Sequence, residues 1–176
     1  FFLETMWGER NAIYGGPPPW LDEAIVRDTL SAAEIQQLRE GFLPAAAPAT
    51  LQRAIEDADR LLHNVGVLHK AGVRLGLGTD TGGVSGGGAF GLASHVEMEL
   101  MVKAGLTPAQ AIVAATRTTA GILGLDELGT IASGRSADFI VLDANPLESI
   151  GNSRKISTVY MQGEEIASHR ARKSHD

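Results

Sequence analysis

A carboxylate at the end of a strand pattern is the residue of this chain best suited to chemistry. Along residues 72–82 (GVRLGLGTDTG) apolar residues alternate with small or polar ones, and this period of two predicts a strand. Asp80 shares its parity with the strand's glycines, and the Gly-rich run to Gly88 ends the strand. Such strand ends are where α/β sheets and barrels do chemistry. Asp80 is therefore a candidate catalytic residue, or else a turn residue capping the next segment.

The residues around Asp80 suggest two other chemistries, and each lacks a required feature. Asp80-Thr81-Gly82 spells the aspartic-protease triplet, but Gly83 follows where Ser or Thr is usual, and the flanking patterns are helical. The loop 82–88 could cradle a phosphate on its backbone N–H groups. It lacks the P-loop lysine and the G-x-G-x-x-G spacing. A flexible loop at the rim of a site is the better interpretation of this run.

Histidine is the other residue type that could serve a metal or a substrate, and its five positions are scattered. His63 and His69 stand six apart on a predicted helix, which is not a shared-face spacing. His169 and His175 belong to a basic tail. His95 opens the helix predicted after the Gly-rich loop, near the expected site. It is either a helix residue without a functional role or a substrate contact.

The first 125 residues carry mainly helical patterns. Ser31 and Thr107 each begin a capping box, and Ser94 is expected to cap the helix over residues 94–104. Gly72 ends the longest predicted helix, and the predicted strand follows at once. This helix and strand form half of a parallel αβ unit. Residues 1–7 are compatible with the end of another strand. Helices are expected at about residues 31–41, 50–71, 94–104, 107–115 and 116–123.

The last fifty residues change to β patterns. Strands are expected at about residues 137–143 and 156–162, and a tight turn at 163–166 leads into a last strand. The run 139–142 is apolar at four consecutive positions, which predicts a strand buried on both faces. A sheet of two or three strands is thin and has unpaired edges. We therefore expect these strands to need partners from outside the chain, and an isolated chain to aggregate or self-associate, for example as a homo-oligomer.

Composition and length exclude several classes of protein. The 176 residues include 15 basic and 21 acidic ones, a net charge of −6, and no basic stripe, which argues against nucleic-acid binding. No apolar run reaches the ~18 residues of a membrane span. The absence of Cys fits a reducing compartment such as the cytoplasm. The chain starts Phe1-Phe2-Leu3 and is shorter than the ~250 residues of a typical α/β barrel. We expect a fragment that lacks the N-terminal part of its protein.

The order of these patterns resembles the C-terminal part of amidohydrolase-superfamily metal hydrolases, nearest to the imidazolonepropionase-like and Xaa-Pro dipeptidase branches. The resemblance covers roughly residues 51–166. It rests on spaced segments: residues 72–82, Glu97-Met-Glu-Leu100, Lys103-Ala-Gly-Leu-Thr-Pro-Ala-Gln-Ala-Ile112, Ala115-Thr116, Ala120-Gly-Ile-Leu-Gly124, Leu128-Gly-Thr-Ile131, Gly134-Arg-Ser-Ala-Asp-Phe-Ile-Val-Leu-Asp143 and Asn145-Pro146-Leu147.

This resemblance implies an α/β fold: the C-terminal part of a (β/α)8 TIM-like barrel at residues 1–125, and part of a small β-sandwich with a tail at 126–176. It implies hydrolysis of a C–N bond in a small amide or dipeptide, including cyclic amides, by a metal-activated water. Asp80 would be the general acid/base and a metal ligand. One or two divalent ions are implied as cofactors, zinc being the expected metal.

The chain also departs from the family pattern. The family's other ligands are a His-x-His pair on the first strand, a Lys or Glu on the fourth, and His on the fifth and sixth. No His-x-His occurs here. As an isolated chain it is therefore expected to be inactive, and the alternative hypothesis is a non-catalytic remnant or interaction module.

Overall fold

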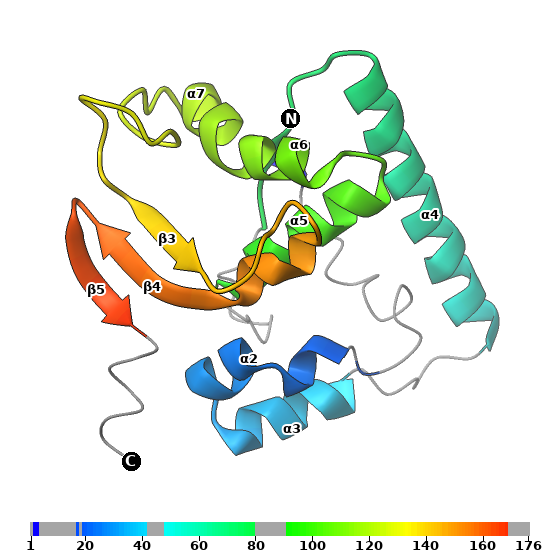
Figure 1. Ribbon diagram of the computed structural model, residues 1–176. Helices are drawn as coiled ribbons and strands as arrows, with labels where there is room; N and C mark the ends of the chain where they lie inside the picture. The colour runs from blue at the N-terminus through cyan, green and yellow to red at the C-terminus, as the bar shows by residue number, and fades with distance from the viewer. Residues whose placement is uncertain (1, 4–16, 18, 42–47, 80–90, 169–176) are drawn as a thin grey trace.

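The computed structural model describes residues 2–3, 17, 19–41, 48–79 and 91–168. In chain order its elements are β1 (Phe2–Leu3), the 3-10 helix η1 (Pro19–Asp22), α2 (Ala24–Thr29), α3 (Ala32–Gly41), α4 (Pro48–Lys70), β2 (Gly76–Leu77), α5 (Leu92–Lys103), α6 (Pro108–Val113), the π-helix η2 (Ala114–Thr118), α7 (Thr119–Leu123), β3 (Phe139–Leu142), the 3-10 helix η3 (Ile150–Arg154), β4 (Ile156–Met161) and β5 (Glu164–Ser168). Helix α5 lies at the middle, between long α4 on one side and the sheet β3–β5 on the other (Figure 1). The result is a mixed α/β arrangement. None of the helices within the described ranges combines the length and the apolar character that a membrane crossing requires.

The first helices form a small unit that docks on α5. The predicted capping box is confirmed: Ser31 N–H donates to Glu34 Oε2 at 2.8 Å, and Glu34 N–H donates to Ser31 Oγ at 3.3 Å. Trp20, one of the largest fully buried side chains, belongs to the apolar cluster between these helices and α5. The other buried members are Leu21, Val26, Leu92, Val96 and Leu100.

Helix α4, strand β2 and α5 follow one another as predicted, and β2 has a parallel partner. Phe2 pairs with Gly76 and Leu3 with Leu77, so β1 and β2 form a parallel ladder. The ladder covers two residues, fewer than in the strand predicted from Val73 to its end at Asp80. Helix α4 approaches the end of α5 closely at Gly66, where a Cβ atom would lie 2.4 Å from the carbonyl oxygen of Ala104. Only glycine allows the two helices to pack at this distance.

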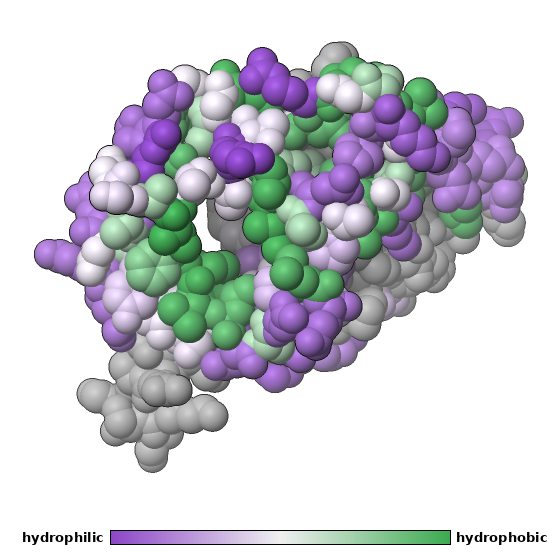
Figure 2. All heavy atoms as spheres, turned by 45° about the horizontal axis from the view of Figure 1, so that its top comes forward, coloured by the Kyte–Doolittle hydropathy of each residue, from purple (hydrophilic) through white to green (hydrophobic). Residues whose placement is uncertain are grey.

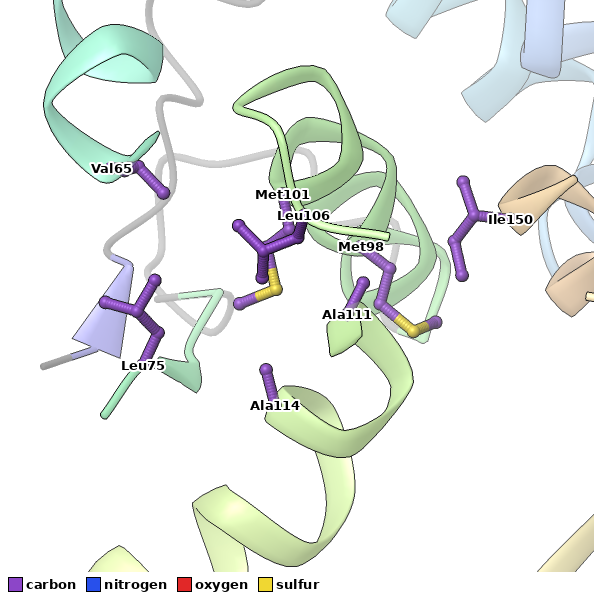
Figure 3. Close-up of a cluster of buried hydrophobic side chains, with 8 residues drawn as sticks. All are labelled: Val65, Leu75, Met98, Met101, Leu106, Ala111, Ala114 and Ile150. Atoms are coloured by element: carbon purple, nitrogen blue, oxygen red, sulfur yellow. The ribbon is translucent and has the colours of Figure 1, made fainter. Parts of the chain in front are cut away.

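A second apolar cluster lies beneath β2 and holds α4, α5 and α6 together. Figure 3 shows its eight side chains converging, with Met101 and Leu106 near the centre. They are Val65, Leu75, Met98, Met101, Leu106, Ala111, Ala114 and Ile150. Met101 and Ala111 are fully buried. This cluster fixes the strand that leads to Asp80 against the central helix.

The starts of α5 and α6 test two predicted caps. At α6 the capping box is confirmed, because Thr107 N–H donates to Gln110 Oε1 at 2.8 Å and Pro108 takes the first helical position. At α5 the predicted cap is wrong. The helix begins at Leu92, two residues before Ser94, and no side chain caps it. The helix starts earlier than predicted because Leu92 is buried in the first cluster, and its N-cap residue, Gly91, has a φ of 79°.

The C-terminal strands form an antiparallel sheet in the order β3–β4–β5. Phe139 lies opposite Tyr160, and their rings stack with centroids 4.7 Å apart. The prediction of a strand buried on both faces is wrong, since Ile140 and Val141 are 43% and 42% exposed. The described residues leave both faces of β3 open in part, and apolar side chains show at the surface around a hollow in Figure 2.

Candidate functional site

Strand β2 ends at Leu77, three positions before the candidate acid/base. Asp80 itself lies outside the described residues, so its role as general acid/base and metal ligand stays a prediction. The structure does describe what leads to it: Leu75 and Gly76 are buried, and Gly78 and Thr79 are half-buried. The strand that precedes Asp80 is therefore anchored in the interior.

A threonine of the following helices holds the end of β2. Leu77 N–H donates to Thr119 Oγ1 at 2.9 Å, and the same hydroxyl donates to the carbonyl oxygen of Ala114 at 2.7 Å. Residues 77 and 119 are 42 positions apart. The sequence does not predict this link, because a threonine at a helix start gives no signal of a distant backbone partner.

The second predicted site residue, His95, is buried in α5 and faces η3. Its exposed fraction is 9%, and its Nδ1 lies 2.9 Å from Ser153 Oγ. The pKa of His95 is lowered to about 4, first by burial and then by the charge of Arg154, while the charge of Glu23 acts in the opposite direction. The imidazole is therefore neutral at pH 7. Its proposed substrate contact stays a prediction, while the contact that the structure shows is with Ser153.

Arg154, next to Ser153, joins three elements through two carboxylates. Its Nε and Nη2 contact Glu23 at 2.6 and 2.8 Å, and its Nη1 contacts Glu99 at 2.5 Å. Burial opposes its charge, but hydrogen bonds and the charges of Glu23 and Glu99 outweigh burial and raise the pKa of Arg154. The guanidinium thus ties the start of α2 to α5 and η3. Sequence reasoning missed this residue as well.

The titration of His95 gives a pH prediction. Its ordinary pKa is 6.5, so between pH 6.5 and about 4 the unfolded chain binds a proton that the folded protein does not. We expect its contribution to stability to be complete above pH 6.5 and to fall by up to about 3 kcal/mol as the pH drops to 4. Urea unfolding of the full-length protein at several pH values measures this loss.

In the same experiment His95→Asn should flatten the pH dependence, since Asn keeps a polar group near Ser153 and does not titrate. His63→Asn is the matched control, because His63 is exposed on α4. Equal pH dependence in wild type and His95→Asn contradicts the prediction.

Metal ligation by this chain rests on few residues. Within residues 19–41, 48–79 and 91–168, no three His, Cys, Asp or Glu side chains gather closely enough to hold an ion. His95 is engaged with Ser153 in the interior. A metal centre that includes Asp80 would need further ligands from outside these described residues.

Comparison with known proteins identifies the family of this chain. The model of the amidohydrolase family matches residues 22–166, so the chain belongs to the amidohydrolase family. This family is generally metal-dependent. An imidazolonepropionase of Cereibacter sphaeroides is 35% identical over 124 residues, which cover 66% of this chain and 31% of that protein. The chain thus spans about a third of the length of the curated relatives it matches.

Solved structures agree in fold. An amidohydrolase matches with 30% identity and a TM-score of 0.56, over 77% of this chain and 33% of the other. A protein of Bifidobacterium longum provisionally assigned as a prolidase matches with 34% identity and a TM-score of 0.58, over 69% and 30%. A Xaa-Pro dipeptidase with methionine in its active site matches with 25% identity and a TM-score of 0.57, over 77% and 33%. The mixed α/β fold is therefore that of amidohydrolase structures.

Proposed function

We propose that the full-length protein hydrolyses a C–N bond in a small amide, a dipeptide or a cyclic amide, with a divalent metal ion as cofactor. The observation that carries this proposal is the position of Asp80. In the chain it follows a partly buried parallel strand by three residues, within the stretch that matches the amidohydrolase family. In this proposal residues 1–125 are part of a (β/α)8 barrel and residues 126–176 are part of a β-sandwich.

Asp80 has a defined task in this chemistry. A bound divalent ion, zinc being the first candidate, polarises the scissile carbonyl and lowers the pKa of water. The Asp80 carboxylate accepts the proton of the attacking water and returns it to the leaving nitrogen as the C–N bond breaks. Ligands besides Asp80 would come from parts of the protein outside this chain.

The names of two relatives support this choice of substrate class. They are named as an imidazolonepropionase and a Xaa-Pro dipeptidase. A panel of Xaa-Pro dipeptides and cyclic amides, incubated with full-length protein and Zn²⁺ or Mn²⁺, tests the proposal by the release of product carboxylate. Hydrolysis that a chelator abolishes supports it. No turnover of any C–N substrate by a folded, metal-loaded protein contradicts it.

The isolated 176-residue chain is expected to show no amidase activity. Catalytic zinc sites take three protein ligands, and this chain offers Asp80 as its one predicted ligand. Metal titration of the purified chain, followed by an amidase assay, measures this. Tight Zn²⁺ binding with chelator-sensitive turnover by the chain alone contradicts the prediction. Weak binding without turnover agrees equally with the alternative of an interaction module, which the assay of the full-length protein separates.

A further inference from the structure

We infer that Thr119 is a positioning residue, whose hydroxyl sets the end of strand β2, the strand that leads in the chain to Asp80. The inference rests on the function proposed above for Asp80. Thr119 touches no reacting group in this assignment; it acts through the backbone of Leu77.

The directions of the two hydrogen bonds are fixed by chemistry. The Thr119 hydroxyl has one proton, which it donates to the carbonyl oxygen of Ala114 at 2.7 Å. Its oxygen then accepts the N–H of Leu77 at 2.9 Å. Because the Ala114 carbonyl holds the hydroxyl proton, the Thr119 oxygen keeps a lone pair aimed at the N–H of Leu77 in β2.

The π-helix turn η2 explains why Thr119 can reach the strand. The carbonyl oxygen of Ala114 accepts both the N–H and the hydroxyl of Thr119, five residues later. This wider turn replaces the regular α-helical pairing between residues four apart. Single π turns inside helices occur frequently at functional sites. Ala114 is buried in the cluster of Figure 3, so the turn is anchored on its inner side.

The turn is also in close contact with Gly129. At Gly129 a Cβ atom would lie 2.8 Å from the carbonyl oxygen of Thr116 and 2.9 Å from Cβ of Ala120. The backbone at Gly129 therefore packs directly on the turn. Since Leu77 of β2 and Gly129 both contact this turn, the position of the Thr119 hydroxyl is tightly restricted.

The test compares Thr119→Val with Thr119→Ser in the full-length protein. Valine keeps the shape but removes both hydrogen bonds, whereas serine keeps the hydroxyl. We expect Thr119→Val to lower kcat roughly tenfold to a hundredfold with little change in KM, because small misplacements near a reacting group can cost about 10²-fold. The kcat of Thr119→Ser should stay within about threefold of the wild-type value, a smaller change than that expected for Thr119→Val.

The matched control is Thr116→Val. The Thr116 hydroxyl donates to the carbonyl oxygen of Ile112 at 2.7 Å, so this change also removes a threonine hydrogen bond to the helix backbone. It leaves Leu77 untouched, and kcat should stay near the wild-type value. If Thr119→Val does not fold, Thr119→Ala takes its place in the comparison.

Amide hydrogen exchange supplies a readout besides activity. A peptide containing Leu77 should exchange faster in Thr119→Val than in wild type, Thr119→Ser or Thr116→Val. Unchanged exchange there overturns the inference, and so does an unchanged kcat in Thr119→Val when Asp80→Asn is inactive. If Asp80→Asn keeps full activity, the proposed function fails, and faster exchange then still supports the link between Thr119 and β2.

Discussion

Replacing Asp80 by Asn in the full-length protein is expected to lower kcat by about 10²–10⁴-fold, the usual contribution of general acid–base catalysis. Asn has the shape of Asp and can still cap a turn, but it cannot accept the proton of a water molecule. In the sequence pattern Asp80 has the parity of Gly76 and Gly78, which predicts a side chain on the side away from the branched aliphatic residues. We therefore expect a melting temperature close to that of the wild type.

The measurement is kcat together with the melting temperature of the metal-loaded variant. Asp126→Asn is the matched control, because Asp126 is an exposed residue just after α7. It should leave both quantities unchanged. A kcat for Asp80→Asn within about threefold of wild type, below the range of general acid–base effects, would mean that Asp80 is a turn residue.

Local signals in the sequence predicted most of the helices, although α2 was not among them. Both capping boxes are confirmed, because each depends on residues three positions apart and needs no tertiary information. The long amphipathic helix ends at Lys70, close to the predicted end, since Gly72 follows with a positive φ. Where burial competes with a capping residue, as at Leu92 and Ser94, burial decides the boundary.

Long-range contacts could not be predicted in the same way. The bond between Thr119 and Leu77 joins residues 42 positions apart, and Arg154 reaches Glu23 across 131 positions. No periodic pattern in the sequence indicates such long-range pairs. The both-face burial predicted for β3 failed for a related reason, because an apolar run shows what a strand can bury and says nothing of what covers it. For the candidate site, the sequence indicated Asp80 while its supporting residues appeared only in the structure.

The buried ionic cluster of Arg154 yields the second large prediction. Arg154→Met should lower the free energy of unfolding of the full-length protein by about 2–4 kcal/mol, because it leaves two carboxylates without their cation. The side chain of Arg154 is 9% exposed, whereas those of Glu23 and Glu99 are 36% and 25% exposed. The carboxylates keep some access to water, which places the cost below the upper end of the range for fully buried pairs.

Urea unfolding with Arg39→Met as matched control measures this effect. Arg39 pairs with exposed Asp22 at 2.8 Å, so its loss should cost at most about 1 kcal/mol. Adding Glu23→Gln and Glu99→Gln to Arg154→Met should recover part of the stability, because the uncompensated charges are then removed. Equal costs for Arg154→Met and Arg39→Met, or no recovery in the triple variant, would show that Arg154 packs against the helices without acting as the charge that joins α2, α5 and η3.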